Sequence, residues 1–350
     1  MHRILLVGCA FLALTACGRS GSSTEAAVPD SVIRGVNFIG VHVSDLDAAE
    51  RYYASTVDAS TIDSASLPAG NTLSQLVDTG DGAVETRLIR KTNTQLRLMT
   101  FAERSARSQM VEAVVVQGPG ISHMCFPVAQ ETAAYRQFLE AGANPNGESE
   151  LVQLNPKNPV RYGYVTDPDG IITEIEEVDV AKLERETPVK NLIRFRHVSL
   201  ATPDLDRLID FYSVLLGGQE PRHVGKWLAI GGENIDKVSG LPDSKIEMAW
   251  FQLRNLEIEI FQYHSHPTEV PRQPRPIDAP GYNMIVFDVS SIEDARQRVL
   301  EAGGEIVGEP GPLDGGKILF ARDPDGNLLG LQTLPTESVY SAANFPDNGI

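Results

Sequence analysis

Segments of alternating apolar and polar residues recur along this chain, and each leads into a stretch with the apolar spacing of an amphipathic helix. The segment 36–47 predicts a strand that runs into a helix start, and the segment 196–206 repeats this pattern. In both, an aspartate, Asp45 or Asp204, stands where an N-cap side chain would accept hydrogen bonds from free backbone N–H groups. The pattern therefore predicts two closely related units that begin with a strand and a helix.

A second pair of segments is equally alike. The strand-like segments 120–126 and 281–287 each lead to a predicted helix that ends in Leu-Glu-Ala-Gly. Each unit then reaches a turn with the sequence Asp-Pro-Asp-Gly, at 167–170 and 323–326, and a final strand. The chain thus predicts four repeats of a strand, a helix and about three further strands. We call these repeats modules one to four, and they span 34–104, 118–180, 192–266 and 280–334.

The order of the modules predicts two domains. Modules one and two are expected to form a first domain over 34–180, and modules three and four a second domain over 192–334. The charged segment 181–191 is the expected linker between them, and residues 335–350 are the expected tail.

The N-terminus predicts export. A short basic start leads to the apolar run 4–14, which is too short to span a bilayer and is typical of a signal peptide over 1–16. The sequence Leu-Thr-Ala-Cys resembles a bacterial lipobox, which implies cleavage before Cys17 and lipidation of that residue; a plain secretory signal is the alternative. Residues 17–33 predict a flexible tether. We therefore expect a lipid-anchored protein on the periplasmic side, at the outer membrane.

The charge balance restricts the partners. The chain has 47 acidic and 30 basic residues, so its formal net charge is −17. Such a balance disfavours nucleic acid and anionic membrane surfaces, and membrane contact is expected only through the N-terminal lipid. Of the three cysteines, only Cys125 lies within the expected folded body, so no intramolecular disulfide is expected there.

The repeated strand and helix starts, together with the two Asp-Pro-Asp-Gly turns, resemble the vicinal oxygen chelate superfamily. That superfamily includes glyoxalase I, bleomycin-resistance proteins, extradiol dioxygenases and methylmalonyl-CoA epimerases. The resemblance covers nearly the whole mature chain and implies an α+β fold, in which pairs of βαβββ modules curl into two half-barrel clefts. It does not name a substrate, because one fold hosts many reactions.

The resemblance also implies that each module offers metal ligands from its first and last strands. In modules two and three these positions hold ligand-type residues: His123, Glu174, His197 and Glu259. In modules one and four they hold residues that are not usual ligands: Phe38, Arg97, Met284 and Gly330. Pairing module two with three would create one complete site and leave one empty cleft, whereas pairing along the sequence would leave two half-sites. A buried glutamate without a partner is costly, so the ligand positions favour pairing module two with three.

Strand parity agrees with this assignment, because successive side chains point to opposite faces. Val198 and Leu200 are apolar and are expected under the helix, so His197 faces the concave side. Glu257 and Glu259 share one face, which makes Glu259 the least certain ligand. A hydrogen-bonded core histidine and a solvated glutamate are the alternatives for any one of these residues.

Other residues are weaker candidates. His42 faces the expected empty cleft and is a candidate acid–base group or substrate contact. Arg97 is expected either to bind an anion in that cleft or to pair with a surface carboxylate. Tyr263 and His264 follow the strand of Glu259 and are expected at the rim of the metal cleft, where His264 is a candidate proton shuttle.

Two imidazoles and two carboxylates suit one divalent ion, such as Fe, Mn, Zn, Ni or Co. Four protein ligands would leave two positions of an octahedron for neighbouring oxygens of a substrate, and Glu174 or Glu259 could detach as the general base. We therefore expect an exported isomerase, epimerase or lyase that acts on a small oxygenated compound. Because four modules complete the pairing that one-domain relatives achieve by dimerising, we expect a monomer.

Two alternatives remain. If Glu259 is not a ligand, the other three residues form a two-histidine, one-carboxylate triad, which suits an extradiol-type dioxygenase with Fe(II). The other alternative is a metal-free binding or resistance protein that holds its ligand with Trp227, Trp250 and other aromatic residues of the cleft.

Overall fold

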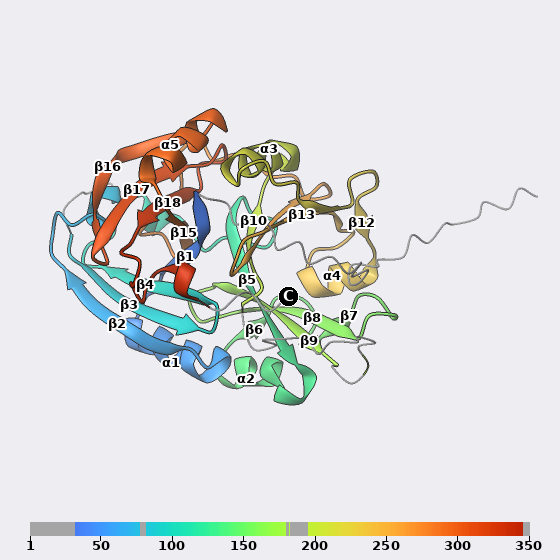
Figure 1. The fold of residues 1–350 in the computed structure, drawn as a ribbon. Coiled ribbons are helices and arrows are strands. Elements are labelled where there is room, and N and C mark those ends of the chain that lie inside the picture. The colour runs from blue at the N-terminus through green and yellow to red at the C-terminus, as the bar shows by residue number, and fades with distance from the viewer. Residues whose placement is uncertain (1–31, 78–81, 180–181, 183–194, 346–350) are drawn as a thin grey trace, which may run out of the picture.

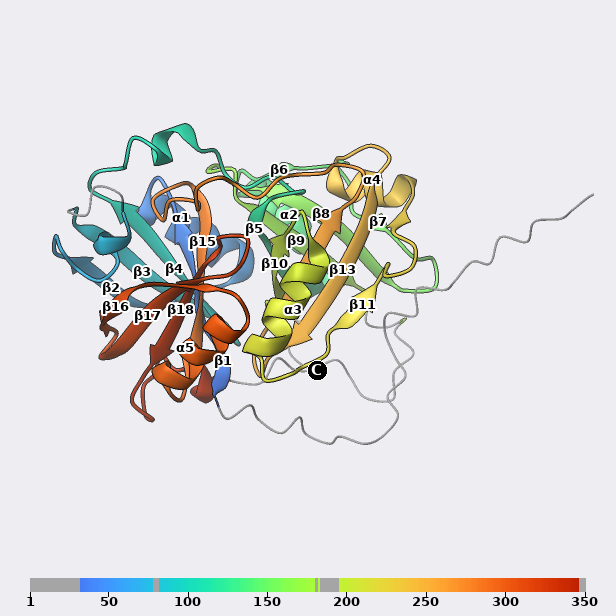
Figure 2. The same cartoon turned by 90° about the horizontal axis from the view of Figure 1, so that it is seen from above.

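The computed structural model of this protein describes residues 32–77, 82–179, 182 and 195–345. This part of the chain forms an α+β fold with two curled sheets that stand next to each other (Figures 1 and 2). The predicted fold class is therefore confirmed.

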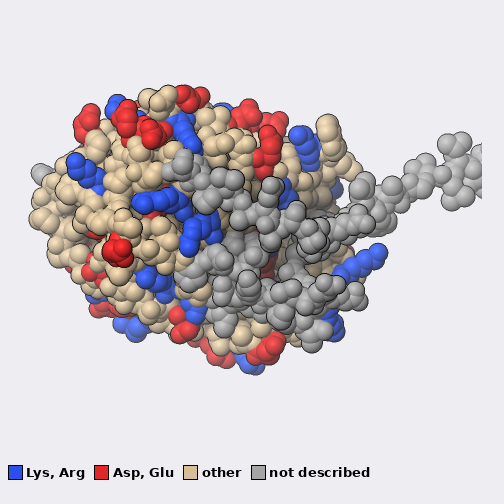
Figure 3. Space-filling view, in the orientation of Figure 1, with Lys and Arg blue, Asp and Glu red and all other residues tan. Residues whose placement is uncertain are grey.

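Several predicted features lie outside the described residues. They are the signal peptide over 1–16, the lipidation site Cys17, nearly all of the tether and nearly all of the linker 181–191. Within the described ranges, no helix combines the length and the apolar character needed to cross a membrane. Figure 3 shows acidic and basic side chains interspersed over the face that it presents.

The first sheet joins the two ends of the described chain. Its eight strands lie in the order β16-β17-β18-β15-β1-β4-β3-β2. The central strands β1 and β15 pair antiparallel, and each has a parallel neighbour, β4 or β18. The strands are β1 (Ile33–His42), β2 (Ser60–Leu67), β3 (Val84–Lys91), β4 (Thr94–Phe101), β15 (Gly281–Val289), β16 (Glu305–Leu313), β17 (Gly316–Arg322) and β18 (Leu328–Thr333).

The second sheet contains the middle of the chain. Eight of its ten strands follow the order β11-β13-β14-β10-β5-β9-β8-β6, while β12 pairs with β13 and β7 with β8. Its centre repeats the first sheet, because β5 and β10 pair antiparallel and each has a parallel neighbour, β9 or β14. The strands are β5 (Gly120–Ala129), β6 (Asn144–Pro145), β7 (Val152–Gln153), β8 (Val160–Thr166), β9 (Ile172–Val178), β10 (His197–Ala201), β11 (Arg222–Val224), β12 (Ile230–Gly231), β13 (Lys245–Gln252) and β14 (Glu257–Tyr263).

The sheets pair module one with module four and module two with module three. This is the arrangement that a single complete ligand set requires, so the predicted pairing of the modules is confirmed. Each sheet consequently takes strands from both sides of the linker 181–191.

Helices cover the faces on which the two sheets approach each other. Helix α1 contacts α2, and α3 contacts α5, so one helix pair lies on either side of the central strands (Figure 1). The largest apolar cluster contains side chains from these four helices and from the central strands of both sheets. The α-helices are α1 (Leu46–Val57), α2 (Ala134–Glu140), α3 (Leu205–Leu215), α4 (Glu233–Ser239) and α5 (Ile292–Glu301), and the short 3₁₀ helices are η1 (Ser74–Leu76), η2 (Ser108–Met110), η3 (Gln130–Thr132) and η5 (Ala342–Asn344).

The predicted helix starts and strand faces are confirmed. Asp45 caps α1 by accepting a hydrogen bond from the backbone N–H of Ala48, and Asp204 caps α3 in the same way. Val198 and Leu200 pack in the core between the sheets, as strand parity predicted. The concave faces of both sheets therefore point away from this core.

The concave face of the first sheet is packed rather than hollow, so the expected empty cleft is filled. Phe38 and Met284 belong to a second apolar cluster that covers this face. Gly330 makes room for it, because a Cβ atom there would lie 2.8 Å from Val286 Cγ2 and 2.9 Å from Ile318 Cδ1. Large apolar side chains around a small residue fill the space that a ligand would need.

The C-terminal segment packs against the first sheet. The backbone N–H of Ala342, in η5, donates to the Oδ1 atom of Asn37 on β1 at 2.7 Å. Phe345 is buried and lies under the guanidinium of Arg90. The described part of the expected tail is thus an integral part of this sheet.

Candidate metal centre

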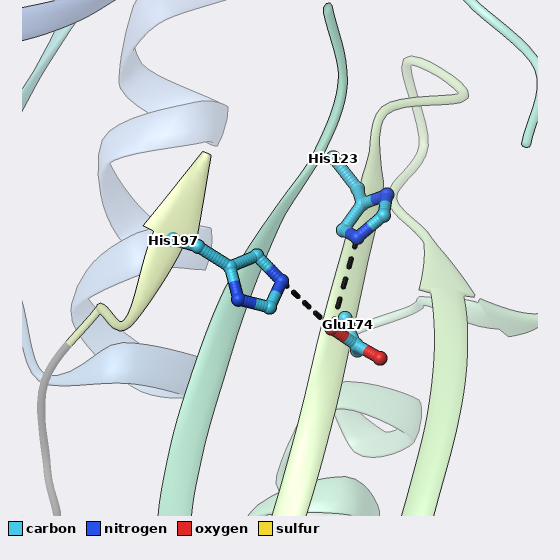
Figure 4. A group of neighbouring side chains, drawn as sticks. All are labelled: His123, Glu174 and His197. Atoms are coloured by element: carbon cyan, nitrogen blue, oxygen red, sulfur yellow. Dashed lines mark hydrogen bonds and ion pairs between the residues drawn. The ribbon is translucent and has the colours of Figure 1, made fainter. Parts of the chain in front are cut away.

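Four strands of the second sheet bring the four predicted ligands together. The two histidines lie on the central strands, and each glutamate lies on the parallel neighbour of a central strand. In register, Ser199 of β10 stands opposite both His123 and Glu259. Figure 4 shows the side chains of His123, His197 and Glu174 directed toward one another from three strands. We call His123, Glu174, His197 and Glu259 the ligand cluster.

The distances within the ligand cluster are short. The Nε2 atom of His197 lies 3.0 Å from Glu174 Oε2 and 3.3 Å from Glu259 Oε2. The Nε2 atom of His123 lies 3.7 Å and 3.4 Å from the same two oxygens. The Nε2 atom of each histidine therefore lies close to one oxygen of Glu174 and one oxygen of Glu259.

Burial makes the charges of the ligand cluster interdependent. The exposed fractions of the four residues range from 0% for His123 to 8% for Glu174. Burial alone would lower the pKa of His123, but the neighbouring carboxylates of Glu174 and Glu259 raise it to about 9. Burial acts to raise the pKa of Glu174 and of Glu259, yet the two histidines hold both below the usual value. The cluster thus favours carboxylates that face a cationic centre.

Three residues of the ligand cluster fit a single metal ion as they stand, because the ligand atoms of His123, Glu174 and His197 all lie within 4.8 Å of one another. Ligand atoms that share one ion at bonds of about 2.0–2.2 Å lie roughly 3.0–3.6 Å apart in tetrahedral or neighbouring octahedral positions. Three of the four histidine–glutamate distances, 3.0–3.4 Å, lie within this range, and the fourth, between His123 and Glu174, is 3.7 Å. The buried Nε2 atom of His123 has no hydrogen-bond partner, which a lone pair reserved for a metal would explain.

Two serines orient members of the ligand cluster, and the sequence analysis did not identify either role. The hydroxyl of Ser199 donates to Glu259 Oε2. The hydroxyl of Ser122 donates to the carbonyl of Val116 and lies 3.3 Å from His123 Nδ1. The Ser122 hydroxyl proton points to the carbonyl of Val116, so the hydroxyl oxygen is free to accept a hydrogen bond from Nδ1–H of His123. In this tautomer the lone pair of Nε2 faces the cluster. Strand parity predicts that Ser199 shares the concave face of His197, but it does not predict the hydrogen bond to Glu259.

A second buried network adjoins the ligand cluster. Arg196 donates to Glu176 at 2.6 Å and to Glu257 at 3.0 Å. Glu176 lies two residues beyond Glu174 on β9, and Glu257 lies two residues before Glu259 on β14. Because residues two apart on a strand share a face, the sequence indicates that Glu176 and Glu257 lie on the same face as the ligands. Only the fold shows that Arg196 joins these two glutamates.

Cys125 and the aromatic residues also lie near the ligand cluster. The Sγ atom of Cys125 and carboxylate oxygens of Glu174 and Glu176 lie within 4.8 Å of one another. Trp250 stands opposite Glu259 in the sheet, with the guanidinium of Arg222 3.8 Å from its ring centre. Trp227, by contrast, is 92% exposed on a loop.

The rim residues fall on different faces of the second sheet. Tyr263 is buried on the same face as Glu259 and packs edge-on against Phe261, which in turn contacts the ring of His123. His264 pairs with Glu247 at 2.8 Å, and Glu247 points to the face opposite that of Glu259. The structure therefore brings Tyr263 to the cluster side and places His264 away from it.

His42 and Arg97 are buried in the first sheet. The Nδ1 atom of His42 lies 3.1 Å from the carbonyl of Met99. Burial, together with Arg104, lowers the pKa of His42 to about 4, so its ring is neutral at physiological pH. Arg97 donates two hydrogen bonds of 2.7 Å to Asp314, a carboxylate that is itself buried rather than on the surface.

A cavity of about 280 Å³ lies at one end of the second sheet. Ile172, which lines it, precedes Glu174 by two residues and shares its face of β9. Val116 and Leu241 line it as well. Helix α4, which ends beside Leu241, contacts β8 and covers this end of the concave face.

Residues 194–331 match the sequence model of the Glyoxalase/Bleomycin resistance protein/Dioxygenase superfamily. This sequence similarity lies in modules three and four. It is similar to lactoylglutathione lyase of Arabidopsis thaliana, with 26% identity over 163 residues, 44% of this chain and 50% of that protein. It is 25% identical to lactoylglutathione lyase of Escherichia coli O157:H7 over 149 residues, 40% of this chain and 91% of that protein. The chain thus spans about half the length of the plant relative.

Solved structures of glyoxalase-like proteins share the fold. Glyoxalase I from Zea mays superimposes with a TM-score of 0.55 and 18% identity, and the match covers 85% of this chain and 92% of that chain. A putative dioxygenase from Bacillus subtilis superimposes with a TM-score of 0.54 and 12% identity, covering 90% and 89% of the two chains. At these identities the likeness establishes the architecture and leaves the reaction open.

Proposed function

We propose that this protein is a metal-dependent enzyme of the isomerase, epimerase or lyase type. The ligand cluster would hold one divalent ion, such as Fe, Mn, Zn, Ni or Co, and a small substrate would chelate that ion through two neighbouring oxygens. The observation that carries the proposal is that the Nε2 atoms of two histidines lie 3.0–3.7 Å from oxygens of two glutamates, with the four residues supplied by two modules. The similarity to lactoylglutathione lyases supports this class of reaction.

The bound ion would supply Lewis-acid stabilisation of negative charge on a substrate oxygen. The residues of the protein itself would orient the substrate and accept a proton from it. Ser199 anchors Glu259 through a hydrogen bond, which favours Glu174 as the carboxylate that accepts a proton from the substrate carbon. Tyr164, opposite Glu174 on β8, packs 4.8 Å from the ring of His123 and restricts water on that side.

One observation supports a second candidate function. His123, Glu174 and His197 alone form a group with ligand atoms within 4.8 Å of one another, and Glu259 is engaged by the hydroxyl of Ser199. If Glu259 stays with the serine, the remaining two histidines and one carboxylate suit Fe(II) and O₂. The reaction would then be an extradiol-type ring cleavage.

The proposal includes an extracytoplasmic location and a monomeric state. The apolar run before Cys17 supports export and lipid anchoring on the periplasmic side, with the outer membrane as the destination. Such a location argues against cytosolic thiols and CoA esters as substrates. The internal pairing of module two with module three supports a monomer, because the ligand cluster needs no second copy.

The proposal is tested first by metal analysis of the protein that lacks residues 1–17. Mass spectrometry is expected to find about one transition-metal ion per chain, and a double variant, His123→Ala with His197→Ala, is expected to hold none. The reaction type is tested by NMR in D₂O with hydroxyacetone, a small hydroxyketone whose C–H groups should exchange faster with the loaded protein.

The alternatives have distinct results in the same experiments. Uptake of O₂ with catechol by the Fe(II)-loaded protein, without exchange on hydroxyacetone, would favour the dioxygenase. Absence of any bound ion after incubation with Fe, Mn, Zn, Ni or Co would overturn the proposal and favour a metal-free binding protein.

A further inference from the structure

A second group of metal-binding residue types lies at the edge of the second sheet, on the face opposite the ligand cluster. His223 is on the edge strand β11, Glu247 is on β13, and His264 directly follows β14. Figure 2 shows β11 beside β13 at this edge. Glu247 points away from the ligand cluster, because Trp250, three residues later on the same strand, stands opposite Glu259. We call His223, Glu247 and His264 the edge group.

Two short hydrogen bonds to one carboxylate hold the edge group together. The Nε2 atom of His223 lies 2.7 Å from Oε1 of Glu247. The Nε2 atom of His264 lies 2.8 Å from Oε2 of the same residue. Each imidazole thus contacts a different oxygen, and one glutamate joins two histidines that come from different parts of the sheet.

The negative charge of Glu247 has no permanent counter-charge nearby. The side chains of Glu247 and His223 are only 14% and 13% exposed. Among the described residues, no lysine or arginine forms an ion pair with Glu247, although Lys245 shares its face of β13. Neutral imidazoles supply hydrogen bonds but no charge, and a largely buried carboxylate is stabilised by a cation. A cation that binds to the edge group would supply this missing charge.

The residue types specify the class of cation. Two imidazoles and one carboxylate suit borderline divalent ions such as Zn²⁺, Ni²⁺ or Cu²⁺, whereas Mg²⁺ and Ca²⁺ prefer oxygen ligands. We propose that the edge group is a second metal site, separate from the ligand cluster. In this site His223 and His264 bind the ion through Nε2, and Glu247 binds it through both carboxylate oxygens.

The ion takes the place of the two hydrogen-bond protons. Each imidazole binds it as the tautomer with the proton on Nδ1, and water carries the proton from Nε2 to Nδ1. The two rings also turn toward a common point, since in the absence of an ion each contacts its own oxygen. His264 can move at little cost, because its side chain is 40% exposed and lies beyond the end of β14. The bound ion then ties the edge strand β11 to β13 and to the end of β14.

The edge group is expected to hold its ion more weakly than the ligand cluster. It has three residues instead of four, it is more exposed, and its two imidazoles must first reorient. The ion is therefore expected to be lost during purification and to bind again when Zn²⁺ is added in excess. For this reason the test is a titration and not an analysis of the purified protein.

The test uses a protein whose ligand cluster is disabled by His123→Ala with His197→Ala. This double variant is titrated with Zn²⁺ in competition with a chelating dye. We expect it to bind one ion per chain. Adding either His223→Ala or His264→Ala is expected to weaken this binding at least about tenfold, since loss of even an outer-shell partner of a ligand costs 10–100-fold.

His266→Ala, added to the same double variant, is the matched control. His266 lies two residues after His264, and its Nδ1 atom lies 2.9 Å from the hydroxyl oxygen of Ser265, outside the edge group. The affinity for Zn²⁺ is expected to stay unchanged in this variant. An equal loss in His266→Ala and His264→Ala would overturn the proposal, because it would mean non-specific binding to exposed histidines.

The remaining outcomes separate this proposal from the proposed function. A double variant that melts like the unaltered protein and binds no Zn²⁺ would overturn the edge group as a metal site and leave the ligand cluster untouched. If the double variant does not fold, the unaltered protein is titrated instead, and two ions are expected, with one in His223→Ala. The same number of ions in both would contradict the proposal.

Discussion

The two sheets have the same central arrangement but opposite interiors. Each has an antiparallel pair of central strands with a parallel neighbour on either side. At the ligand positions the second sheet has two histidines and two glutamates, whereas the first has Phe38, Arg97, Met284 and Gly330. One backbone scaffold thus supports either a polar, ligand-type centre or a packed apolar core, and the side chains at these positions decide between them.

Arg97 shows how the first sheet accommodates the one charge left at such a position. Its side chain is 1% exposed, and it pairs with Asp314 from the loop between β16 and β17. Its guanidinium also lies 4.7 Å from the ring centre of Phe38. The equivalent position in the second sheet holds a ligand-type glutamate. In the first sheet, Arg97 at this position instead forms a buried ion pair between modules one and four.

The largest expected effect comes from removing a ligand in the second sheet. His197→Ala is expected to lower the affinity for Co²⁺ or Zn²⁺ by more than about 100-fold, since loss of even an outer-shell partner of a ligand costs 10–100-fold. Met284→Leu, at the corresponding position of the first sheet, should leave affinity unchanged. Competition with a chelating dye measures both. Equal affinity in the two variants would contradict the contrast between the sheets.

The next largest effect is expected on stability, when the ion pair of the first sheet is broken. Arg97→Met is expected to reduce the free energy of unfolding by about 3–5 kcal/mol, because Asp314 would remain buried without its partner. The double variant Arg97→Met with Asp314→Asn should recover much of this loss, and asparagine tolerates the left-handed backbone at this position (φ 54°). Urea denaturation measures the stabilities. A double variant no more stable than Arg97→Met would argue against an unpaired carboxylate as the cause.

The smallest effect tests how tightly the first sheet is packed. Gly330→Ala is expected to destabilise the protein by about 1–3 kcal/mol, because the added methyl group would crowd Val286 and Ile318. Gly82→Ala is the control, since its Cβ atom would meet nothing closer than 3.7 Å. Thermal melting of both variants, with metal content as a second measurement, checks the prediction. A Gly330→Ala variant as stable as the control would mean that the neighbouring side chains can shift at little cost in free energy.

Some site residues could be predicted because they depend on near neighbours in the chain. The inward direction of His197 follows from the apolar residues Val198 and Leu200 beside it. The position of His264 could not be predicted in this way, because it lies just beyond the end of β14, where the alternation of faces ceases. The pairing of His264 with Glu247 depends on which strand lies next to β14.

The sequence by itself determined the repeated modules, the helix caps and the ligand-type residues at equivalent positions, because strand alternation and capping hydrogen bonds act over a few residues. The ligand positions favoured the pairing of module two with three, and the sheet order confirmed it. Only the tertiary structure decided that apolar packing fills the other interior and that Arg196 joins Glu176 to Glu257. These features depend on contacts between residues far apart in the chain, and local patterns do not specify which distant segments meet.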